Sequence, residues 1–567
     1  MKQKRKILYN ILFFGIIIII LALLTVNFSK SELIYYGGDE PRHFMNGVFY
    51  KDFFWDKGWK SPIDYTICYY AQYPALSIYQ YPPFFYLLEA AAFNVFGVSK
   101  NTAQWLSFLI VITGLYYFFK YVNEKFNRTT ALLSSLLFIS TTIFLKNYGN
   151  VIIDIPSLSL MLIFLYYFDR WDRLRDKKTF IYAALFLALT VMTAIKTAFV
   201  LFFILVFLAY KFIAQKSGLS RKRVLIILYS GIVLFFVAFG TSADIAKIPF
   251  FYRTLHGYEM VSLFDIKELI LEKNLSILIT KFQLIKNFGY MRLLLCLLGG
   301  IFAYKNGEKN KFLFYFLFSI TFFAVFFTIG SRRFASDRFN LYLLPCVSLA
   351  AGYGANSLIK LTKNRTRLIL LVSLILYLST NILSTQARVF KGYKAAAEEV
   401  LKLNKDKNPI LIDASLDGTF IAYIRMYDNA REQVIFRGDK ILYASNLYLD
   451  NIEKIYVFDE QSVYEILDKY SIRFILVDKK FLEITPKSIL RQVLKNNKTF
   501  KYIKTFSVET NMEQHDGSAD LGLYEYKQYK KNYEEQIEIY VGAMNRTITF
   551  RIKDIKDKKN CTKAVRK

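Results

Sequence analysis

Two adjacent acids, Asp39 and Glu40, follow the first long apolar run of the chain, within the stretch Gly37-Gly-Asp-Glu-Pro-Arg-His43. Carboxylates beside hydrocarbon are costly to keep, so their presence suggests a chemical use. They are equally well explained as solvated loop acids or as caps of a following helix. A further acid, Asp154, lies at a similar place before a later apolar run. That recurrence favours the functional interpretation.

The composition defines the environment in which these acids must work. The chain has 567 residues, of which 54% are hydrophobic, and its mean hydropathy is +0.26. The apolar residues come in long blocks, which is typical of a polytopic α-helical membrane protein. The formal net charge of +30 falls largely in short loops between these blocks. There it sets topology and meets anionic lipid, so nucleic acid is a poor candidate partner.

The positive-inside rule then orients the chain. The basic start Met1–Lys6 stays in the cytoplasm. The apolar run that follows it to about Val26 resembles a signal peptide, but it approaches spanning length and no small-x-small cleavage site is obvious after it. We therefore expect an uncleaved first span. The residues 33–102 form a first external loop. Its apolar stretch 83–97 is too short to cross, so we expect a helix in the outer interface. About 11 spans follow from this choice, with the carboxyl end outside. After the first, they are expected at 103–121, 130–147, 155–169, 180–195, 197–213, 223–241, 289–304, 312–330, 339–358 and 367–385.

This topology brings acids and bases from distant parts of the chain to the outer face. They come from the loop after the first span, from two span ends, from the loop 242–288 and from the stretch 331–338. The members are Asp39, Glu40, Asp154, Lys196, Arg253, His256, Arg332, Arg333 and Arg338. Their gathering at one depth on one side is the strongest functional signal in the sequence.

The pattern changes after about residue 390. Short β-branched runs at 410–413, 434–436, 455–458 and 474–478 alternate with helical patterns at 462–470 and 486–495. Further strands are expected at 502–508 and 521–526. The sequence therefore predicts a membrane domain over 1–388, a small extracytoplasmic α/β domain with a partly parallel sheet over 389–530, and a charged hairpin or tail over 531–567. The four cysteines show no metal-ligand spacing and give no support for a disulfide framework.

Four short motifs recur together in a familiar order. They are Asp39-Glu40 after the first span, Tyr81-Pro-Pro-Phe-Phe-Tyr86, Asp154-Ile-Pro156 opening a span, and Arg338-Phe-x-x-Tyr342-x-x-Pro345 entering a late one. The set, over about residues 5–385, resembles the GT-C fold glycosyltransferases that use polyprenyl-phosphate sugars. The protein O-mannosyltransferases of glycosyltransferase family 39 and the aminoarabinose transferase are the most similar branches. The resemblance implies a GT-C-like membrane domain and glycan biosynthesis in the cell envelope.

The resemblance also implies roles for the acids. Asp39 matches the family's base, which removes the proton of the acceptor hydroxyl as that hydroxyl attacks the anomeric carbon. Glu40 is expected to orient the loop or to pair with Arg42. Asp154 matches a second acid that steers the acceptor or helps to hold a divalent metal ion, although capping of its own helix explains it as well.

Cations are expected around the donor phosphate, because a departing phosphate needs positive charge rather than a proton. Arg338 matches the family's Arg near the donor, with Tyr342 one turn later, although a snorkelling interfacial Arg is the alternative. The further donor-phosphate candidates are Lys196, Arg253, Arg332 and Arg333.

Three residues of the first external loop are candidate substrate contacts: Tyr81, Arg42 and His43. Tyr81 is a departure from the family pattern, because some relatives have Lys or His before the Pro-Pro pair. Another cation, such as Lys196 or Arg253, must then compensate at the donor site.

The sequence thus predicts an inverting glycosyltransferase of the cell membrane. It would move a sugar from a polyprenyl-phosphate donor to a lipid-linked glycan, a cell-wall polymer or a protein on the outer face. No cofactor is certain, and a divalent metal ion is left open. The alternative is a transporter or flippase of a polyprenyl-linked glycan, but transport sites lie near the bilayer midplane and repeated halves are not evident.

Overall fold

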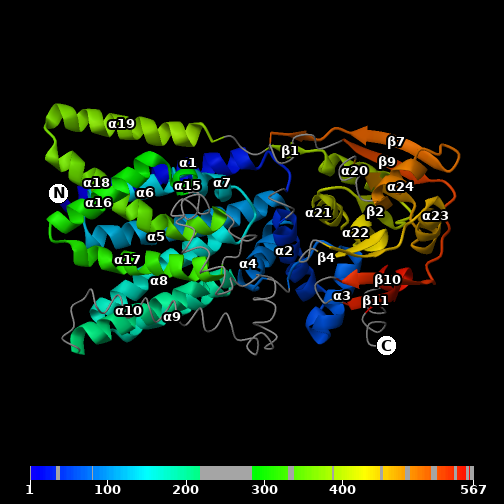
Figure 1. Ribbon diagram of the computed structural model, residues 1–567, viewed down its shortest axis with the longest axis horizontal. Helices are drawn as coiled ribbons and strands as arrows, with labels where there is room; N and C mark the ends of the chain where they lie inside the picture. Colours follow the sequence, from blue (N-terminus) through cyan, green and yellow to red (C-terminus); the bar gives the residue numbers. More distant parts are fainter. Residues whose placement is uncertain are drawn as a thin grey trace, which may run out of the picture. The chain divides into compact units, whose positions relative to one another are not determined.

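The computed structural model describes residues 2–33, 39–78, 81–216, 284–329, 337–385, 389–446, 451–478, 485–511, 520–541, 546–556 and 561. The chain divides into two compact units (Figure 1). Unit 1 comprises Met1–Ile18, Leu109–Tyr148 and Ile153–Gln386. Unit 2 comprises Ile19–Phe108, Gly149–Ile152 and Ala387–Lys567. The division falls within two continuous helices, α1 (Lys2–Phe28) and α5 (Lys100–Lys125).

Helices from the apolar runs build unit 1. In chain order they are α6 (Arg128–Ile139), α7 (Thr142–Tyr148), α8 (Asp154–Leu174), α9 (Lys177–Val191), η3 (Ile195–Ala198), α10 (Phe199–Lys216), α15 (Leu284–Phe288), α16 (Tyr290–Lys305), α17 (Lys309–Ile329), η5 (Asp337–Leu343), α18 (Leu344–Leu361) and α19 (Asn364–Leu383). Polar residues in the short loops fix where helices begin. The side chain of Asn127 accepts the N–H of Thr130 at the start of α6, and Asp176 accepts that of Thr179 at the start of α9.

Four of the described helical segments are long and apolar enough to cross a membrane: Lys100–Lys125, Ile195–Ile213, Arg338–Leu361 and Asn364–Leu383. The pair α6 and α7 is bent by 58° and makes up to one span more. The predicted span 130–147 is therefore broken in the middle. The polytopic helical class is confirmed. The count of about 11 spans stays a prediction, and the expected span 223–241 lies outside the described residues.

Small residues allow two helices of unit 1 to pack closely. A Cβ atom on Gly299 of α16 would collide with the backbone oxygen of Ala350 in α18, and one on Gly354 would collide with that of Leu295. Only glycine fits where two helix backbones approach this closely, as in other membrane helix pairs.

A five-stranded sheet is the centre of the C-terminal part of unit 2. Its order is β3-β2-β6-β9-β7. The strands β2 (Ile410–Asp413), β3 (Ile435–Arg437) and β6 (Phe474–Val477) run parallel, while β9 (Leu521–Tyr526) pairs antiparallel with β6 and β7 (Phe500–Phe506). Every residue of β2 and β6 is buried, as expected for central parallel strands.

Helices and three small ribbons surround this sheet in the C-terminal part. The helices are α20 (Tyr393–Leu403), α21 (Asp417–Tyr427), α22 (Gly438–Ile441), α23 (Glu460–Lys469), α24 (Thr485–Val493) and α25 (Ile552–Lys556). The ribbons pair β1 (Phe390–Lys391) with β8 (Glu509–Thr510), β4 (Tyr443–Asn446) with β5 (Asn451–Ile455), and β10 (Gln536–Val541) with β11 (Arg546–Arg551). The predicted strand at 455–458 is wrong in position, because β5 ends at Ile455. The remaining strand and helix expectations match within a few residues.

The N-terminal segment of unit 2 packs against these C-terminal elements. It holds α2 (Asp39–Trp55), η2 (Gly58–Lys60), α3 (Pro62–Gln72) and α4 (Phe84–Phe96), the helix expected in the interface. Phe44 and Tyr69 share one buried core with Phe420 and Ile421 of α21. The carboxylate of Glu32 accepts the backbone N–H groups of residues 392–394 at 2.9–3.1 Å, which caps the start of α20. The boundary predicted near residue 388 stays a prediction, although the compact units group the first external loop with the C-terminal residues.

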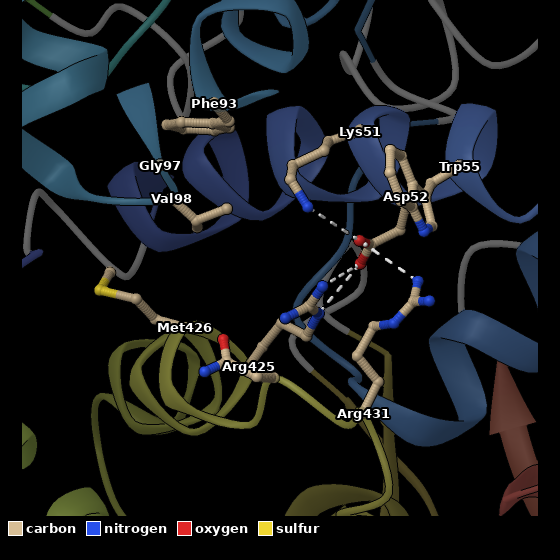
Figure 2. A pocket seen from close by; sticks show the side chains of 10 residues that line it. Lys51, Asp52, Trp55, Phe93, Gly97, Val98, Arg425, Met426 and Arg431 are labelled. Atoms are coloured by element: carbon tan, nitrogen blue, oxygen red, sulfur yellow. Dashed lines mark hydrogen bonds and ion pairs between the residues drawn. The ribbon is translucent and has the colours of Figure 1, made fainter. Parts of the chain in front are cut away.

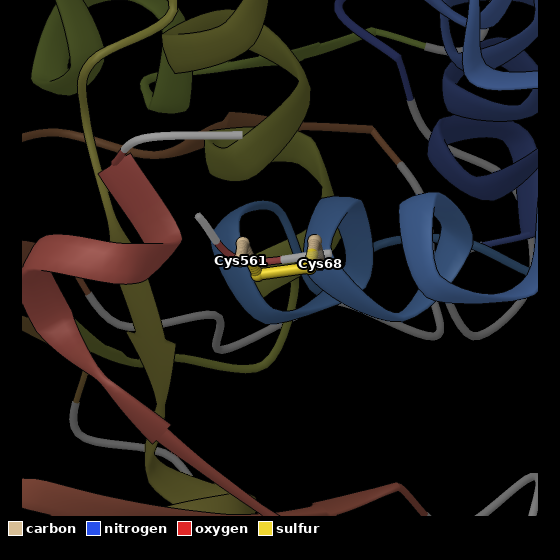
Figure 3. The surroundings of a disulfide bond; sticks show 2 residues. All are labelled: Cys68 and Cys561. Atoms are coloured by element: carbon tan, nitrogen blue, oxygen red, sulfur yellow. A yellow bond between two sulfur atoms is a disulfide. The ribbon is translucent and has the colours of Figure 1, made fainter. Parts of the chain in front are cut away.

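A disulfide corrects the expectation drawn from the cysteines. Cys68 of α3 is bonded to Cys561, with a sequence separation of 493 residues (Figure 3). A disulfide between cysteines so far apart cannot be predicted from local cysteine spacing. The other two cysteines, Cys296 and Cys346, are free.

Candidate active site

The first turn of α2 carries the two adjacent acids that follow the first apolar run of the sequence. Asp39 and Glu40 lie where backbone N–H groups point outward and favour negative charge. Their surroundings differ although they are neighbours. The Glu40 side chain is fully buried, whereas Asp39 is only half-buried. Of the two, Asp39 is therefore the more solvent-accessible acid.

Glu40 is held by contacts within unit 2. Its Oε1 accepts the backbone N–H of Val151 at 2.8 Å and lies 3.8 Å from the Nζ of Lys100. Lys100 in turn donates to the carbonyl oxygens of Ser31 and Glu32, at 2.9 and 3.1 Å. A buried carboxylate needs such partners. Glu40 thus ties α2 to the segment 149–152, and its predicted role in orienting the loop stays a prediction.

His43 lies one turn after Asp39 and is buried. Its Nδ1 is 2.6 Å from the hydroxyl of Tyr86 on α4, and its ring centroid is 4.6 Å from that of Tyr81. The structure therefore brings together the predicted residues His43 and Tyr81. Arg42 interacts electrostatically with Asp417 and Asp439 of the C-terminal part of unit 2, and burial raises the pKa of the Asp417 carboxyl.

The second acid, Asp154, opens α8 in unit 1. Its buried carboxylate forms an ion pair with Lys196 of η3. The Lys196 ammonium also lies 4.8 Å from the ring centroid of Phe339 in η5, which adds a cation–π contact. The hydroxyl of Tyr342 is 2.7 Å from the Oγ of Ser157, one turn into α8. The predicted residues Asp154, Lys196 and Tyr342 therefore belong to one cluster.

Arg338 begins the helical turn that carries Tyr342 and interacts with it electrostatically. Three other predicted cations, Arg253, Arg332 and Arg333, lie outside the described residues, as does His256. The described candidates thus form two groups. One group, around α2, belongs to unit 2, and the other, around α8 and η5, belongs to unit 1. That the two groups share one cleft stays a prediction.

One buried acid near α2 escaped the sequence reasoning. Glu89 of α4 is completely buried, and neither of its carboxylate oxygens has a hydrogen-bond partner in the part of the chain that the structure describes. Burial raises the pKa of this carboxyl well above its usual range, because burial disfavours the charged form. The signal was present in the sequence, because Glu89 is the one acid in the apolar run 84–96.

A metal ion was left open by the sequence, and the side chains do not assign one. Among the described residues, no three His, Cys, Asp or Glu side chains form a group that could hold a metal. The acid expected to help with a metal, Asp154, is paired with the Lys196 ammonium instead. We therefore assign no metal ligands.

A family model described as dolichyl-phosphate-mannose-protein mannosyltransferase matches residues 80–241. No curated protein sequence matches the chain. Among solved structures, the chain is similar to ArnT from Cupriavidus metallidurans bound to undecaprenyl phosphate, with a TM-score of 0.58, 12% identity and coverage of 92% of this chain and 99% of that one. The apo state of the same protein gives a TM-score of 0.55 at 12% identity, covering 91% and 97% of the two chains.

The archaeal oligosaccharyltransferase AglB from Archaeoglobus fulgidus, in complex with an inhibitory peptide and a dolichol-phosphate, is also similar. Its TM-score is 0.50 at 13% identity, with coverage of 89% of this chain and 74% of that one. These likenesses confirm the predicted GT-C-like fold of a multi-pass membrane protein.

Proposed function

We propose that the chain is an integral-membrane inverting glycosyltransferase that moves a sugar from a polyprenyl-phosphate donor to an acceptor on the outer face of the membrane. The family match and the GT-C-like fold support a membrane glycosyltransferase that uses such donors. The observation that carries the assignment of residues is the contrast in the first turn of α2. There the carboxylate of Glu40 accepts the N–H of Val151 and pairs with Lys100, whereas the side chain of Asp39 is only half-buried.

In this reaction Asp39 acts as the base. Its carboxylate takes the proton of the acceptor hydroxyl while the hydroxyl oxygen attacks the anomeric carbon of the sugar. The bond between the anomeric carbon and the phosphate oxygen breaks on the opposite face, so the configuration inverts. The polyprenyl phosphate leaves as an anion and needs no protonation.

The second cluster supplies charge to the departing phosphate. Lys196 is held in place by the Asp154 carboxylate and by the ring of Phe339, so its ammonium is already oriented before a substrate arrives. Arg338 adds a guanidinium from η5. Asp154 is then a positioning residue that fixes Lys196, rather than a second base.

The disulfide supports the outer-face orientation of unit 2. Bonds such as Cys68–Cys561 form and persist in oxidising compartments and are rare in the cytosol. A membrane-impermeant maleimide tests this in intact cells. We expect it to label Lys60→Cys of unit 2 and not Lys178→Cys, which lies in the first turn of α9. Labelling only at residue 178 would reverse the orientation.

The transfer reaction is tested with the full chain in lipid nanodiscs. Undecaprenyl-phosphate sugars are supplied with lipid-linked glycan, polymer and peptide acceptors, and release of undecaprenyl phosphate is measured. Loss of a general base typically costs 10²–10⁴-fold in rate, so Asp39→Asn should lose at least about 100-fold. The matched control is Asp64→Asn, because Asp64 lies in the first turn of α3 of the same loop. Full turnover by Asp39→Asn would refute the role of this residue.

A further inference from the structure

Unit 2 contains a cavity that none of the predicted site residues line. Its volume is about 340 Å³, at the lower end of the range for small-molecule sites. Figure 2 shows that side chains from the end of α2 meet side chains from α21 and the loop after it. The polar and aromatic residues that matter for a ligand are Lys51, Asp52, Trp55, Arg425, Asn429 and Arg431.

A buried carboxylate organises the cations of this cavity. Asp52 accepts hydrogen bonds from Nε and Nη2 of Arg425, at 3.0 and 2.5 Å, and from the hydroxyl of Tyr69 at 2.8 Å. Arg431 lies 3.3 Å from the same carboxylate, and Lys51 lies 3.7 Å from it. The carboxylate is thus fully engaged, and the surrounding cations are fixed in place at the cavity wall.

The charge balance of the cavity is positive. Arg431 is also held by Asp56, through two contacts of 2.7 Å. Three cations therefore face two carboxylates, Asp52 and Asp56, and both carboxylates already accept several hydrogen bonds. Within the described residues the Lys51 ammonium makes no hydrogen bond, so its donors are open to a ligand. An anionic group is the complement of such a wall.

An exposed indole adds a second element of recognition. Trp55 is 76% exposed, although the large side chain of Trp is mostly buried on average. It lines the cavity near Asp52, and Phe93 lies apart from it, beyond Lys51 (Figure 2). An aromatic face presents an apolar plate against which the C–H face of a sugar ring can pack, while the indole N–H remains a donor.

The cavity is separate from the candidate base on the same helix. Asp39 occupies the first turn of α2, whereas Asp52 and Trp55 occupy its last turns. At 1.5 Å per residue, the 13 residues from Asp39 to Asp52 correspond to about 20 Å along the helix. A ligand in the cavity would therefore be bound at a distance from the reacting atoms.

We propose that this cavity is an accessory site that binds an acidic saccharide, a sugar carrying a carboxylate. The Lys51 ammonium donates to this carboxylate, Arg425 and Arg431 add positive charge while they remain bound to Asp52 and Asp56, and Trp55 is the stacking surface. In calling this saccharide part of the acceptor glycan we rest on the proposed function. The binding itself does not depend on Asp39, and it is measurable without any donor.

The test is calorimetric titration of trigalacturonic acid into the full chain in phosphatidylcholine nanodiscs. The fully methyl-esterified trisaccharide serves as the neutral probe. We expect the acid to bind and the ester to bind at least tenfold more weakly. Trp55→Ala and Lys51→Gln should each weaken binding of the acid at least fivefold. The matched controls Trp59→Ala and Lys60→Gln, which change an exposed Trp and an exposed Lys outside the cavity, should leave it unchanged.

Several results would overturn the proposal. These are absence of binding, equal binding of acid and ester, or equal losses in the cavity variants and their controls. Displacement of the acid by phosphatidylglycerol in the nanodisc, or by inorganic phosphate at equal concentration, would also overturn it, because the site would then serve a lipid headgroup or any anion. Asp39→Asn should bind normally. Failure of binding thus leaves the role of Asp39 to be judged by the transfer assay alone.

Discussion

Replacing Asp52 tests whether a buried ion pair holds α2 to the C-terminal part of unit 2. Asp52 is 1% exposed and its partner Arg425 is 4% exposed. In Asp52→Ala the Arg425 guanidinium would stay buried after losing two charge-assisted hydrogen bonds, and Tyr69 would lose its acceptor. Removing one partner of a buried pair costs about 3–5 kcal/mol. Asp52→Asn should cost less, because an amide oxygen still accepts one of these hydrogen bonds.

The measurement is urea unfolding of the full chain in detergent, followed by the fluorescence of tryptophan, to which Trp55 and Trp59 of unit 2 contribute. With a urea dependence of about 2 kcal/mol per molar, a loss of about 3–5 kcal/mol lowers the midpoint by about 1.5–2.5 M. Asp64→Ala is the control; it removes an acid from the first turn of α3 and should cost only about 0.3–1 kcal/mol.

A double variant separates the loss of the ion pair from the cost of leaving one buried charge without its partner. In Asp52→Ala/Arg425→Leu no buried charge is left alone, so part of the lost stability should return. If Asp52→Ala unfolds at the same urea concentration as Asp64→Ala, or if the double variant is as unstable as the sum of the single ones, the pair does not hold the two segments together.

Three further outcomes follow from other contacts. Burial lowers the pKa of Lys556 to about 8, so the charged side chain destabilises the fold below pH 8, and this cost fades as the pH rises toward 10.5. The urea midpoint of Lys556→Met, measured relative to that of the native chain, should therefore be higher at pH 7 than at pH 10. A difference that does not change with pH would contradict this assignment. Reduction of Cys68–Cys561 by dithiothreitol should lower the urea midpoint of the same fluorescence transition, since the bond restrains the unfolded chain, whereas Cys68→Ala should not respond to the reductant. Gly299→Leu should give aggregated protein in size-exclusion chromatography, because its side chain would meet the Ala350 backbone, and Gly300→Leu, with open space at that position, should elute normally.

The sequence was most informative where one local pattern decides the structure. The short apolar stretch 83–97 predicted a helix too short to cross, and α4 spans Phe84–Phe96. Acids in front of apolar runs predicted helix starts, and Asp39 opens α2 while Asp154 opens α8. These features depend on neighbours in the chain, so composition and period are enough to find them.

The partners of the site residues depend on contacts that no local pattern encodes. Glu40 binds Val151, and Asp154 pairs with Lys196. The sequence placed these cations and acids on one face but could not say which would pair. The cavity depends on the contact of Asp52 with Arg425, which lies 373 positions away in the sequence. No pattern around Asp52 predicts this partner. Only the lone acid Glu89 in an apolar helix carried a readable signal that was overlooked.

Because unit 2 combines the predicted first external loop with residues from 387 onward, α2 is synthesised long before the segments that bury it. Until then, the candidate base would lie on a helix whose core partners, such as Phe420 and Ile421, do not yet exist. The Cys68–Cys561 bond can likewise form only after nearly the whole chain has been synthesised, because its two cysteines are 493 residues apart. A premature stop before Phe420 would therefore leave α2 without these core partners, although every helix up to α19 would have been synthesised.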